Sequence, residues 1–223
     1  MVHIVRSFQR PSKALVDGIS PYSPATLHEA QGRLGALDSR IKPTYPGMRA
    51  CGPALTVSCH AADNMMMMAA ITLAQPGDML VVAAGDRPQQ GGFGEVMATA
   101  CMAKGIVALV TDAGTRDGPA VRDLGFNVFC YGLSIKGTVK ETLGTINQPI
   151  VIGGVLIRPG DIVAADDDGV CVVVQERIAE VTKLSEEREA KEAKLMQALR
   201  DGGDFLELTG IGKVLAAKGP TYE

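Results

Sequence analysis

The sequence predicts a single-domain α/β fold with a long C-terminal helix. Between residues 54 and 131, short apolar runs alternate with segments of helical periodicity, which is the pattern of a parallel sheet with crossover helices. After residue 149 the apolar runs are short and separated by turn sequences, which predicts further strands. A helical pattern then runs from residue 176 to about residue 199. We therefore expect an α/β core over residues 1–175 and a C-terminal helix and tail over residues 176–223.

The N-terminal part predicts two helices and one strand. Residues 1–24 show no periodicity, so an irregular start is expected. Ser23-Pro24 supplies an N-cap residue and a proline at the first position of a short helix. The run from Ala54 to Cys59 predicts a strand. Asp63-Asn64 can cap a helix from Met65 to Leu73, whose four consecutive methionines indicate buried packing rather than a copper site.

The middle of the chain alternates strands and helices around a glycine-rich segment. The run from Met79 to Val82 predicts a buried strand, whereas residues 85–94 are too rich in glycine for regular structure. The elements expected after this segment are helices at 95–103 and 117–124 and strands at 106–110, 128–131, 150–156, 161–165 and 170–174.

The composition excludes several classes of function. The chain has 22 basic and 25 acidic residues, a formal net charge of -3 and no basic block, so neither nucleic acid nor a membrane is an expected partner. Neither a leader sequence nor a long apolar run occurs, which predicts a cytoplasmic protein. The five cysteines are scattered without CxxC spacing, which predicts reduced thiols in the core.

The segment from Gly91 to Asp117 gives the strongest indication of a site. Three glycines at its start allow a ligand to approach the backbone, and the helix that begins at Glu95 offers free N–H groups to an anion. Arg116-Asp117 follows the next strand, where a guanidinium can bind a 2-oxo acid and a carboxylate can bind a hard cation. Taken alone, the glycines also fit a flexible loop, and the Arg-Asp pair also fits a surface ion pair.

The histidine content restricts the metals that the chain can bind. Only His3, His28 and His60 occur, and no two of them have the spacing of a metal site. A zinc or iron site built from histidines is therefore not expected. Oxygen ligands remain, and these suit Mg²⁺ or Mn²⁺.

The chain resembles a known family of enzymes. Glu95, twenty further residues and then Arg116-Asp117 resemble the [D/E]-x20-R-D signature of class II pyruvate aldolases with the RraA-like fold, a swivelling β/β/α type. The likeness covers roughly residues 20 to 200. Further segments that match in family order are Leu27-His28-Glu29-Ala30-Gln31-Gly32-Arg33, Gly137-Thr138-Val139-Lys140, Arg158-Pro159-Gly160-Asp161 and Ala165-Asp166-Asp167-Asp168-Gly169-Val170.

This resemblance implies a metal-dependent lyase that acts on a small 2-oxo acid. The implied substrates are 4-hydroxy-4-methyl-2-oxoglutarate and 4-carboxy-4-hydroxy-2-oxoadipate, which are cleaved to pyruvate and a second 2-oxo acid during degradation of aromatic compounds such as protocatechuate and gallate. Oxaloacetate decarboxylation is implied as a side activity, because it yields the same enolate. The implied assembly is a homo-oligomer, a trimer or a hexamer, with active sites between subunits.

The resemblance also implies roles for individual residues. Asp117 would be the direct ligand of Mg²⁺ or Mn²⁺, and Glu95 would hold a water on the metal. Arg116 would bind the pyruvyl half, and Glu192 would reach the site from an adjacent subunit. The polar character of residues 185–194 independently indicates a helix that leaves its own globule. The residues implied in substrate binding are Asn64, Gly94, Glu95, Val96, Met97 and Arg116.

One departure and two alternatives remain open. Ala120 stands where the family usually has Asp or Glu, which puts the support of the site in question. RraA-like regulators of ribonuclease E share the fold without this activity, although they typically lack the aspartate that Asp117 supplies here. A lysine aldolase is a further alternative, with Lys104 as its imine-forming residue.

Overall fold

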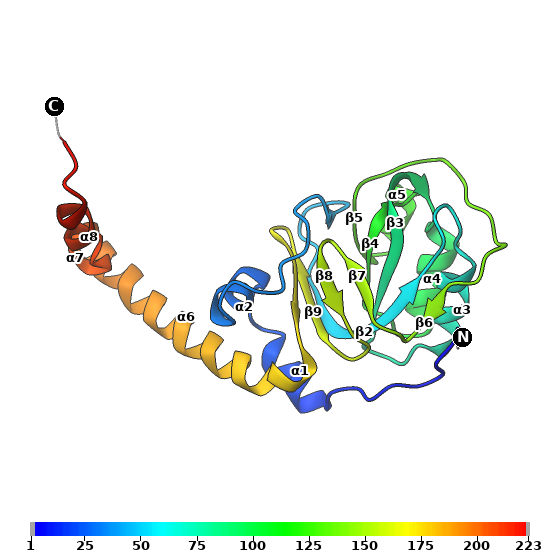
Figure 1. The fold of residues 1–223 in the computed structure, drawn as a ribbon, viewed down its shortest axis with the longest axis horizontal. Coiled ribbons are helices and arrows are strands. Elements are labelled where there is room, and N and C mark those ends of the chain that lie inside the picture. Colours follow the sequence, from blue (N-terminus) through cyan, green and yellow to red (C-terminus); the bar gives the residue numbers. More distant parts are fainter. Residues whose placement is uncertain (1–2, 222–223) are drawn as a thin grey trace.

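An eight-stranded mixed sheet forms the centre of the protein (Figure 1). The structure is a computed structural model that describes residues 3–221, without the side chains of residues 87 and 88. The strand order is β1-β5-β4-β3-β2-β9-β10, and β6 pairs with β2 beside this path. The strands are β1 (Lys42–Pro43), β2 (Ala50–Ser58), β3 (Met79–Gly91), β4 (Ala108–Gly114), β5 (Asn127–Cys130), β6 (Thr145–Ile146), β9 (Ile162–Asp166) and β10 (Gly169–Val173).

The predicted parallel core is present. Strand β2 pairs in parallel with β3, β3 with β4 and β4 with β5, so the carboxyl ends of these four strands lie at one edge of the sheet. The β-rich segment after residue 149 contributes β9 and β10, which extend the sheet beyond β2 in antiparallel register. The mixed α/β fold class is therefore confirmed.

Two of the helices begin at side-chain caps that the sequence predicts. The Ser23 hydroxyl accepts the N–H of Thr26 at 3.1 Å, as the predicted start of α2 requires. At the start of α3 the cap comes from Asp63, whose Oδ1 accepts the N–H of Met65 at 2.8 Å. The helices are α1 (Lys13–Ile19), α2 (Pro24–Ala30), α3 (Met65–Leu73), α4 (Glu95–Ala103), α5 (Gly118–Asp123), the 3₁₀ turn η1 (Gln175–Arg177), α6 (Ile178–Arg200), α7 (Phe205–Thr209) and α8 (Ile211–Lys218).

The expectation of an irregular segment over residues 1–24 is wrong in part. Lys13–Ile19 form α1, which is capped by Ser12 and packs against α6. Ile19 is fully buried there. A helix this short shows no clear hydrophobic period and is stabilised by tertiary packing, so its sequence carries little local signal.

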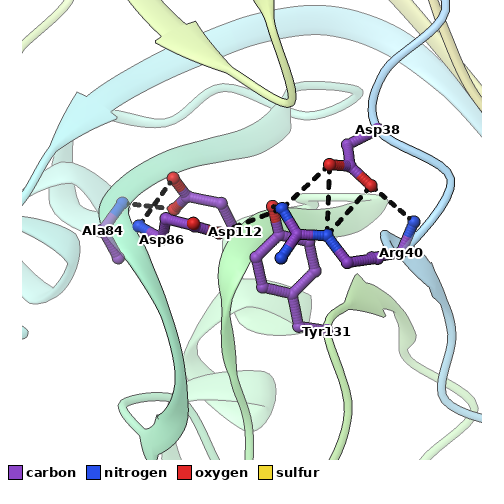
Figure 2. Close-up of polar contacts among 6 residues, drawn as sticks. All are labelled: Asp38, Arg40, Ala84, Asp86, Asp112 and Tyr131. Atoms are coloured by element: carbon purple, nitrogen blue, oxygen red, sulfur yellow. Dashed lines mark hydrogen bonds and ion pairs between the residues drawn. The ribbon is translucent and has the colours of Figure 1, made fainter.

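The expectation that residues 85–94 lack regular structure is also wrong in part, because β3 continues to Gly91. Two register shifts against β4 accommodate the extra residues of β3. The carboxylate of Asp112 lies in this irregular stretch, where it accepts the N–H of Ala84 at 2.6 Å and that of Asp86 at 3.1 Å (Figure 2). A side chain thus replaces part of the missing backbone ladder.

The single strand expected around residues 150–156 is a hairpin. β7 (Ile150–Ile152) pairs with β8 (Val155–Ile157) in antiparallel register. Gly153 and Gly154 between them both have positive φ, which a tight hairpin loop of this kind requires.

The long C-terminal helix joins the globule only through its first turns. Leu27, Ile178 and Val181 are fully buried in a small core that links α2 and α6 to β9 and β10, which stabilises the fold by about 1.5–3 kcal/mol per side chain. Ser185 is the last buried residue of α6, and polar contacts with α2 continue to Glu189. The rest of α6 runs away from the sheet and carries α7 and α8 at its far end (Figure 1). No residue of α7 or α8 is buried.

Two further expectations concern the whole chain. All five cysteines are free, and four of them are buried. Among residues 3–221, no helix combines the length and the apolar character that a membrane span needs.

Candidate active site

A cavity of about 240 Å³ opens where the chain passes from β3 into α4. It lies at the carboxyl ends of the parallel strands β3 and β4, where ligands gather in such sheets. The lining residues are Asn64, Met68, Gly92, Gly94, Val96, Met97, Arg116, Asp117 and Lys140. Six of the residues predicted from the sequence therefore lie together: Asn64, Gly94, Val96, Met97, Arg116 and Asp117.

Asp117 is held in this cavity by the start of α4. Its Oδ2 accepts the backbone N–H of Glu95 at 3.2 Å and lies 3.6 Å from Nε of Arg116. Asp117 precedes α5 but does not cap it through its side chain. Its backbone has the left-handed conformation, with a φ of 57°, instead of the extended conformation usual for a capping residue. Its Oδ1 has no partner among the residues that the structure describes.

Gly94 permits this close approach of α4 and Asp117. A Cβ at Gly94 would collide with Oδ2 of Asp117 and would lie 3.1 Å from Cγ of Arg116. The glycine is therefore needed for its small size, since its φ of -156° is one that any residue adopts. In contrast, a Cβ at Gly92 would meet its nearest atom, in Thr138, at 3.5 Å.

The cavity is suited to anions. Arg116 and Lys140 are its cationic residues and Asp117 is its carboxylate, so two positive charges face one negative charge. The first hydrogen bond within α4 runs from Ala98 to Gly94, which leaves the N–H groups of Val96 and Met97 without acceptors in the described chain. A bound carboxylate can accept these two N–H groups at the positive end of the α4 dipole.

Asn64 contributes a buried polar atom to the wall. The residue is 8% exposed, and its Nδ2 donates to the carbonyl of Gly92 at 2.8 Å. Its Oδ1 has no hydrogen-bond partner in the described structure. Buried polar atoms are rarely left unpaired in proteins, so this oxygen is available to a ligand O–H, an N–H or a water.

Lys140 was not predicted as a site residue, although it lines the cavity. Its segment, Gly137 to Lys140, matches the family order, which was the available signal. The segment has no periodic pattern, so nothing local in the sequence indicated which surface it would reach. Lys140 forms no ion pair with any described residue.

Two predicted residues do not line the cavity. The side chain of Glu95 is exposed, and only its backbone N–H contributes to the site within this chain. Glu192 lies on α6, the helix that runs away from the sheet, and pairs with Arg188 at 2.6 Å. A single subunit therefore does not bring Glu192 to Asp117.

A second polar cluster lies at the same edge of the sheet but does not line the cavity (Figure 2). Arg40 donates to Asp38 at 2.9 Å and to the hydroxyl of Tyr131 at 3.1 Å. Burial and the neighbouring Asp86 raise the pKa of Tyr131 to about 12. Burial also raises the pKa of Asp112, although backbone N–H groups oppose this effect. The cluster thus braces the irregular part of β3, and its carboxylates are engaged by Arg40 and by backbone groups.

Comparison with known proteins identifies the family. The RraA-like family model, described as Aldolase/RraA, matches residues 13–172. The chain belongs to the RraA-like family. A relative from Halalkalibacterium halodurans, provisionally named as a 4-hydroxy-4-methyl-2-oxoglutarate aldolase, is 33% identical over 193 residues, which cover 85% of this chain and 92% of the relative.

Among the solved structures that share this fold, two match most of both chains. An uncharacterized protein from Pseudomonas syringae pv. tomato has a TM-score of 0.83 at 25% identity, covering 92% of this chain and 97% of that one. Streptomyces coelicolor RraAS2, described as an unusual member of the RNase ES inhibitor RraA protein family, has a TM-score of 0.75 at 31% identity, covering 84% of this chain and 98% of that one. RraA-like relatives thus carry names of both an enzyme and an inhibitor.

Proposed function

We propose that this protein is a divalent-metal-dependent aldolase that cleaves a 4-hydroxy-2-oxo acid and releases pyruvate. The observation that carries the proposal is the shared cavity of Arg116 and Asp117, beside the free N–H groups at the start of α4. The proposed substrates are 4-hydroxy-4-methyl-2-oxoglutarate and 4-carboxy-4-hydroxy-2-oxoadipate, with oxaloacetate decarboxylation as a side activity. The provisional name of the Halalkalibacterium halodurans relative supports this class of reaction.

The donor set fits a hard cation held mainly by water. No group of three or more His, Cys, Asp or Glu residues in the described chain is arranged to hold a metal, which disfavours a site built from protein ligands alone. Mg²⁺ commonly keeps several waters and uses one or two carboxylates. Asp117 would supply that carboxylate through its unpaired Oδ1, and Glu95 would hold a water. When bound, Mg²⁺ or Mn²⁺ supplies Lewis-acid stabilisation of negative charge on the C2 oxygen.

Arg116 and α4 hold the pyruvyl half in this proposal. The C1 carboxylate accepts the N–H groups of Val96 and Met97, and the Arg116 guanidinium lies against the carboxylate and the C2 oxygen. Asn64 Oδ1 accepts a hydrogen bond from a substrate hydroxyl or from an ordered water. These groups are preformed, so they stabilise the charge that develops on the C2 oxygen without reorganising.

The bond changes follow the retro-aldol reaction. A water held by the carboxylate of Glu95 or Glu192 takes the proton from the C4 hydroxyl, and the C4–O bond becomes a carbonyl as the C3–C4 bond breaks. The electron pair of that bond moves into the enolate of pyruvate, whose charge rests on the C2 oxygen near Arg116. The carboxylate that received the C4 hydroxyl proton through this water returns it to C3, which completes pyruvate. Lys140, which also lines the cavity, is available to bind the carboxylate at the far end of the substrate.

A pyruvate-release assay tests the proposal. Both hydroxy acids and oxaloacetate are supplied with Mg²⁺, with EDTA and with Asp117→Ala, and borohydride is added to trap any imine. We expect turnover that EDTA and Asp117→Ala abolish and borohydride leaves unaffected. Turnover that persists in EDTA, or covalent trapping at Lys104, would support the lysine aldolase instead.

We further propose that the active site is completed by a neighbouring subunit in a trimer or hexamer, with residues 176–223 packing outside their own α/β core. Phe205, Leu206 and Ile211 on α7 and α8 are 58%, 41% and 43% exposed, which supports a partner for this end of the chain. Val96 beside the cavity is 83% exposed. Glu192 would then reach the cavity of the adjacent copy along α6.

A second candidate function is inhibition of a ribonuclease E-type enzyme. The Streptomyces coelicolor relative, described as a member of an RNase ES inhibitor family, favours it. Asp117 favours the aldolase, because protein binding requires no carboxylate inside the cavity. An RNA-cleavage assay with ribonuclease E, run beside the pyruvate assay, separates the two functions.

A further inference from the structure

Lys140 reaches the cavity from a segment with little structure of its own. Residues 131–144 connect β5 to β6 without forming a helix or a strand, and contain only the isolated bridges of Leu133 and Val139. A connection of this kind has many alternative conformations, so contacts from outside must select the one that brings Lys140 to the pocket.

Asp63 supplies such contacts from the start of α3. Its Oδ2 accepts the N–H groups of Glu141 and Thr142, each at 2.7 Å, and its Oδ1 accepts the N–H of Met65 at 2.8 Å. The residue is only 4% exposed. One buried carboxylate therefore joins the first turn of α3 to the two residues that follow Lys140.

Backbone bonds beside Asp63 extend the same junction. The N–H of Val139 donates to the carbonyl of Ala62 at 2.9 Å, and the N–H of Asn64 donates to the carbonyl of Val139 at 3.2 Å. Lys140 is thus held on both sides, by backbone pairing before it and by the Asp63 carboxylate after it. The carboxylate bonds are the stronger constraint, because bonds to a charged acceptor are roughly twice as strong as neutral ones.

We propose that Asp63 is a positioning residue that fixes Lys140 in the cavity, and that the preference of the site for ligands with a second carboxylate depends on it. The inference rests on the proposed function and deepens it. Lys140 binds the distal carboxylate of the ligand, and Asp63 keeps the segment that carries Lys140 in one conformation. The side chain of Asn64 has a separate bond to the Gly92 carbonyl, although its backbone N–H belongs to the same junction. Loss of the Asp63 contacts therefore releases the Lys140 segment, while the side-chain bond of Asn64 to Gly92 remains.

Asp63→Asn is the main test variant. Its Oδ1 can still accept the N–H of Met65, and Asn is as good a cap residue as Asp, so α3 keeps its start. Its Nδ2 is a donor and then faces the N–H groups of Glu141 and Thr142, which lose their acceptor. Asp63→Ser is the second variant, because serine caps the helix but is too short to reach the loop.

The matched control is Asp161→Asn. Asp161 is 2% exposed and its carboxylate likewise bridges backbone groups, accepting the N–H of Arg158 at 2.8 Å and that of Gln175 at 3.0 Å. It does not line the cavity. A general effect of removing a buried bridging carboxylate therefore appears in both variants, whereas an effect on Lys140 appears only at Asp63.

The binding test uses two 2-oxo acids that differ in the distal carboxylate. Calorimetry in Mg²⁺ measures the dissociation constants of 2-oxoglutarate and 2-oxopentanoate for each protein. We expect the wild type to prefer 2-oxoglutarate by about tenfold, the strength of one hydrogen bond between charged groups. The preference should fall to about threefold or less in Lys140→Met, Asp63→Asn and Asp63→Ser, and persist in Asp161→Asn.

Hydrogen exchange measured by mass spectrometry gives a readout that needs neither ligand nor turnover. Peptides covering residues 139–142 should exchange about tenfold faster in Asp63→Asn than in the wild type, and those of α4 should not change. Unchanged exchange at 139–142 would overturn the proposal. The proposal would also fail if Lys140→Met abolished the preference for 2-oxoglutarate while Asp63→Asn, despite its faster exchange, kept that preference unchanged. If no hydroxy acid releases pyruvate, the aldolase assignment fails alone, and binding and exchange still decide the role of Asp63.

Discussion

The backbone N–H of Glu95 donates to Oδ2 of Asp117 at 3.2 Å, so the first residue of α4 fixes the carboxylate that follows β4. The two residues belong to successive β-α units, and the contact closes one side of the cavity. The two carboxylate oxygens thus differ, because Oδ2 accepts this N–H, whereas Oδ1 has no hydrogen-bond or ion-pair partner in the described chain. The proposed chemistry uses Oδ1 as the ligand of the metal and therefore depends on this difference between the two oxygens.

Replacing Gly94 by alanine should displace Asp117. The added Cβ collides with Oδ2, so we expect pyruvate release to fall by about 100-fold or more, the scale of losing a preorganised electrostatic group. Gly92→Ala is the matched control, since its Cβ meets Thr138 at an ordinary 3.5 Å. Equal activity of the two variants would mean that the position of Asp117 is not critical. The kcat and KM values for oxaloacetate provide the measurement.

Replacing Asn64 by alanine should weaken ligand binding beyond its effect on folding. The change leaves the Gly92 carbonyl without its 2.8 Å donor and should lower the free energy of unfolding by about 1–3 kcal/mol. It also removes Oδ1, so KM should rise.

Asn147 offers a control, because its Nδ2 donates to the carbonyl of Val5 at 2.8 Å and its Oδ1 is likewise unpaired in the described structure. Glycine is the suitable replacement there, since φ is 55°. A similar rise of KM in both variants would remove Asn64 from the site.

Acid should destabilise the wild type more than Asp63→Asn. Burial raises the pKa of Asp63, but the N–H groups of Met65, Glu141 and Thr142 outweigh burial, so the pKa lies below its ordinary value. The stabilisation is therefore fully present above the unfolded pKa of about 4 and is lost as the pH falls through the lower folded pKa. Melting temperatures from pH 6 to pH 2 should converge for the two proteins. Parallel curves over that range would contradict a lowered pKa.

Mixing two inactive variants should restore activity if subunits share sites. Asp117→Asn and Glu192→Gln alter residues that one subunit does not bring together. When the two proteins are unfolded and reassembled together, about one quarter of the sites should receive both native residues. Light scattering should give the mass of the assembly, and pyruvate release should recover to about that fraction. Absence of recovery in a verified mixed oligomer would place Glu192 outside the site.

Much of the core could be predicted because each element carries its own pattern. The runs at Ala54 and Met79 lie in β2 and β3, and Ser23-Pro24 marks the start of α2. The irregular extension of β3 could not be predicted, because it depends on Asp112, which comes from another strand. The helix α1 was missed for a similar reason, since it is stabilised by α6.

The sequence by itself determined the parallel core, the departure of α6 and the neighbourhood of Gly94, Arg116 and Asp117, because periodicity and strand-end position are local properties. The tertiary structure alone decided that Asp63 holds the segment carrying Lys140, a contact between residues 78 positions apart. Hydrogen bonds between residues so far apart in the sequence depend on how the elements pack. The sequence does not indicate which N–H groups will donate to a given carboxylate.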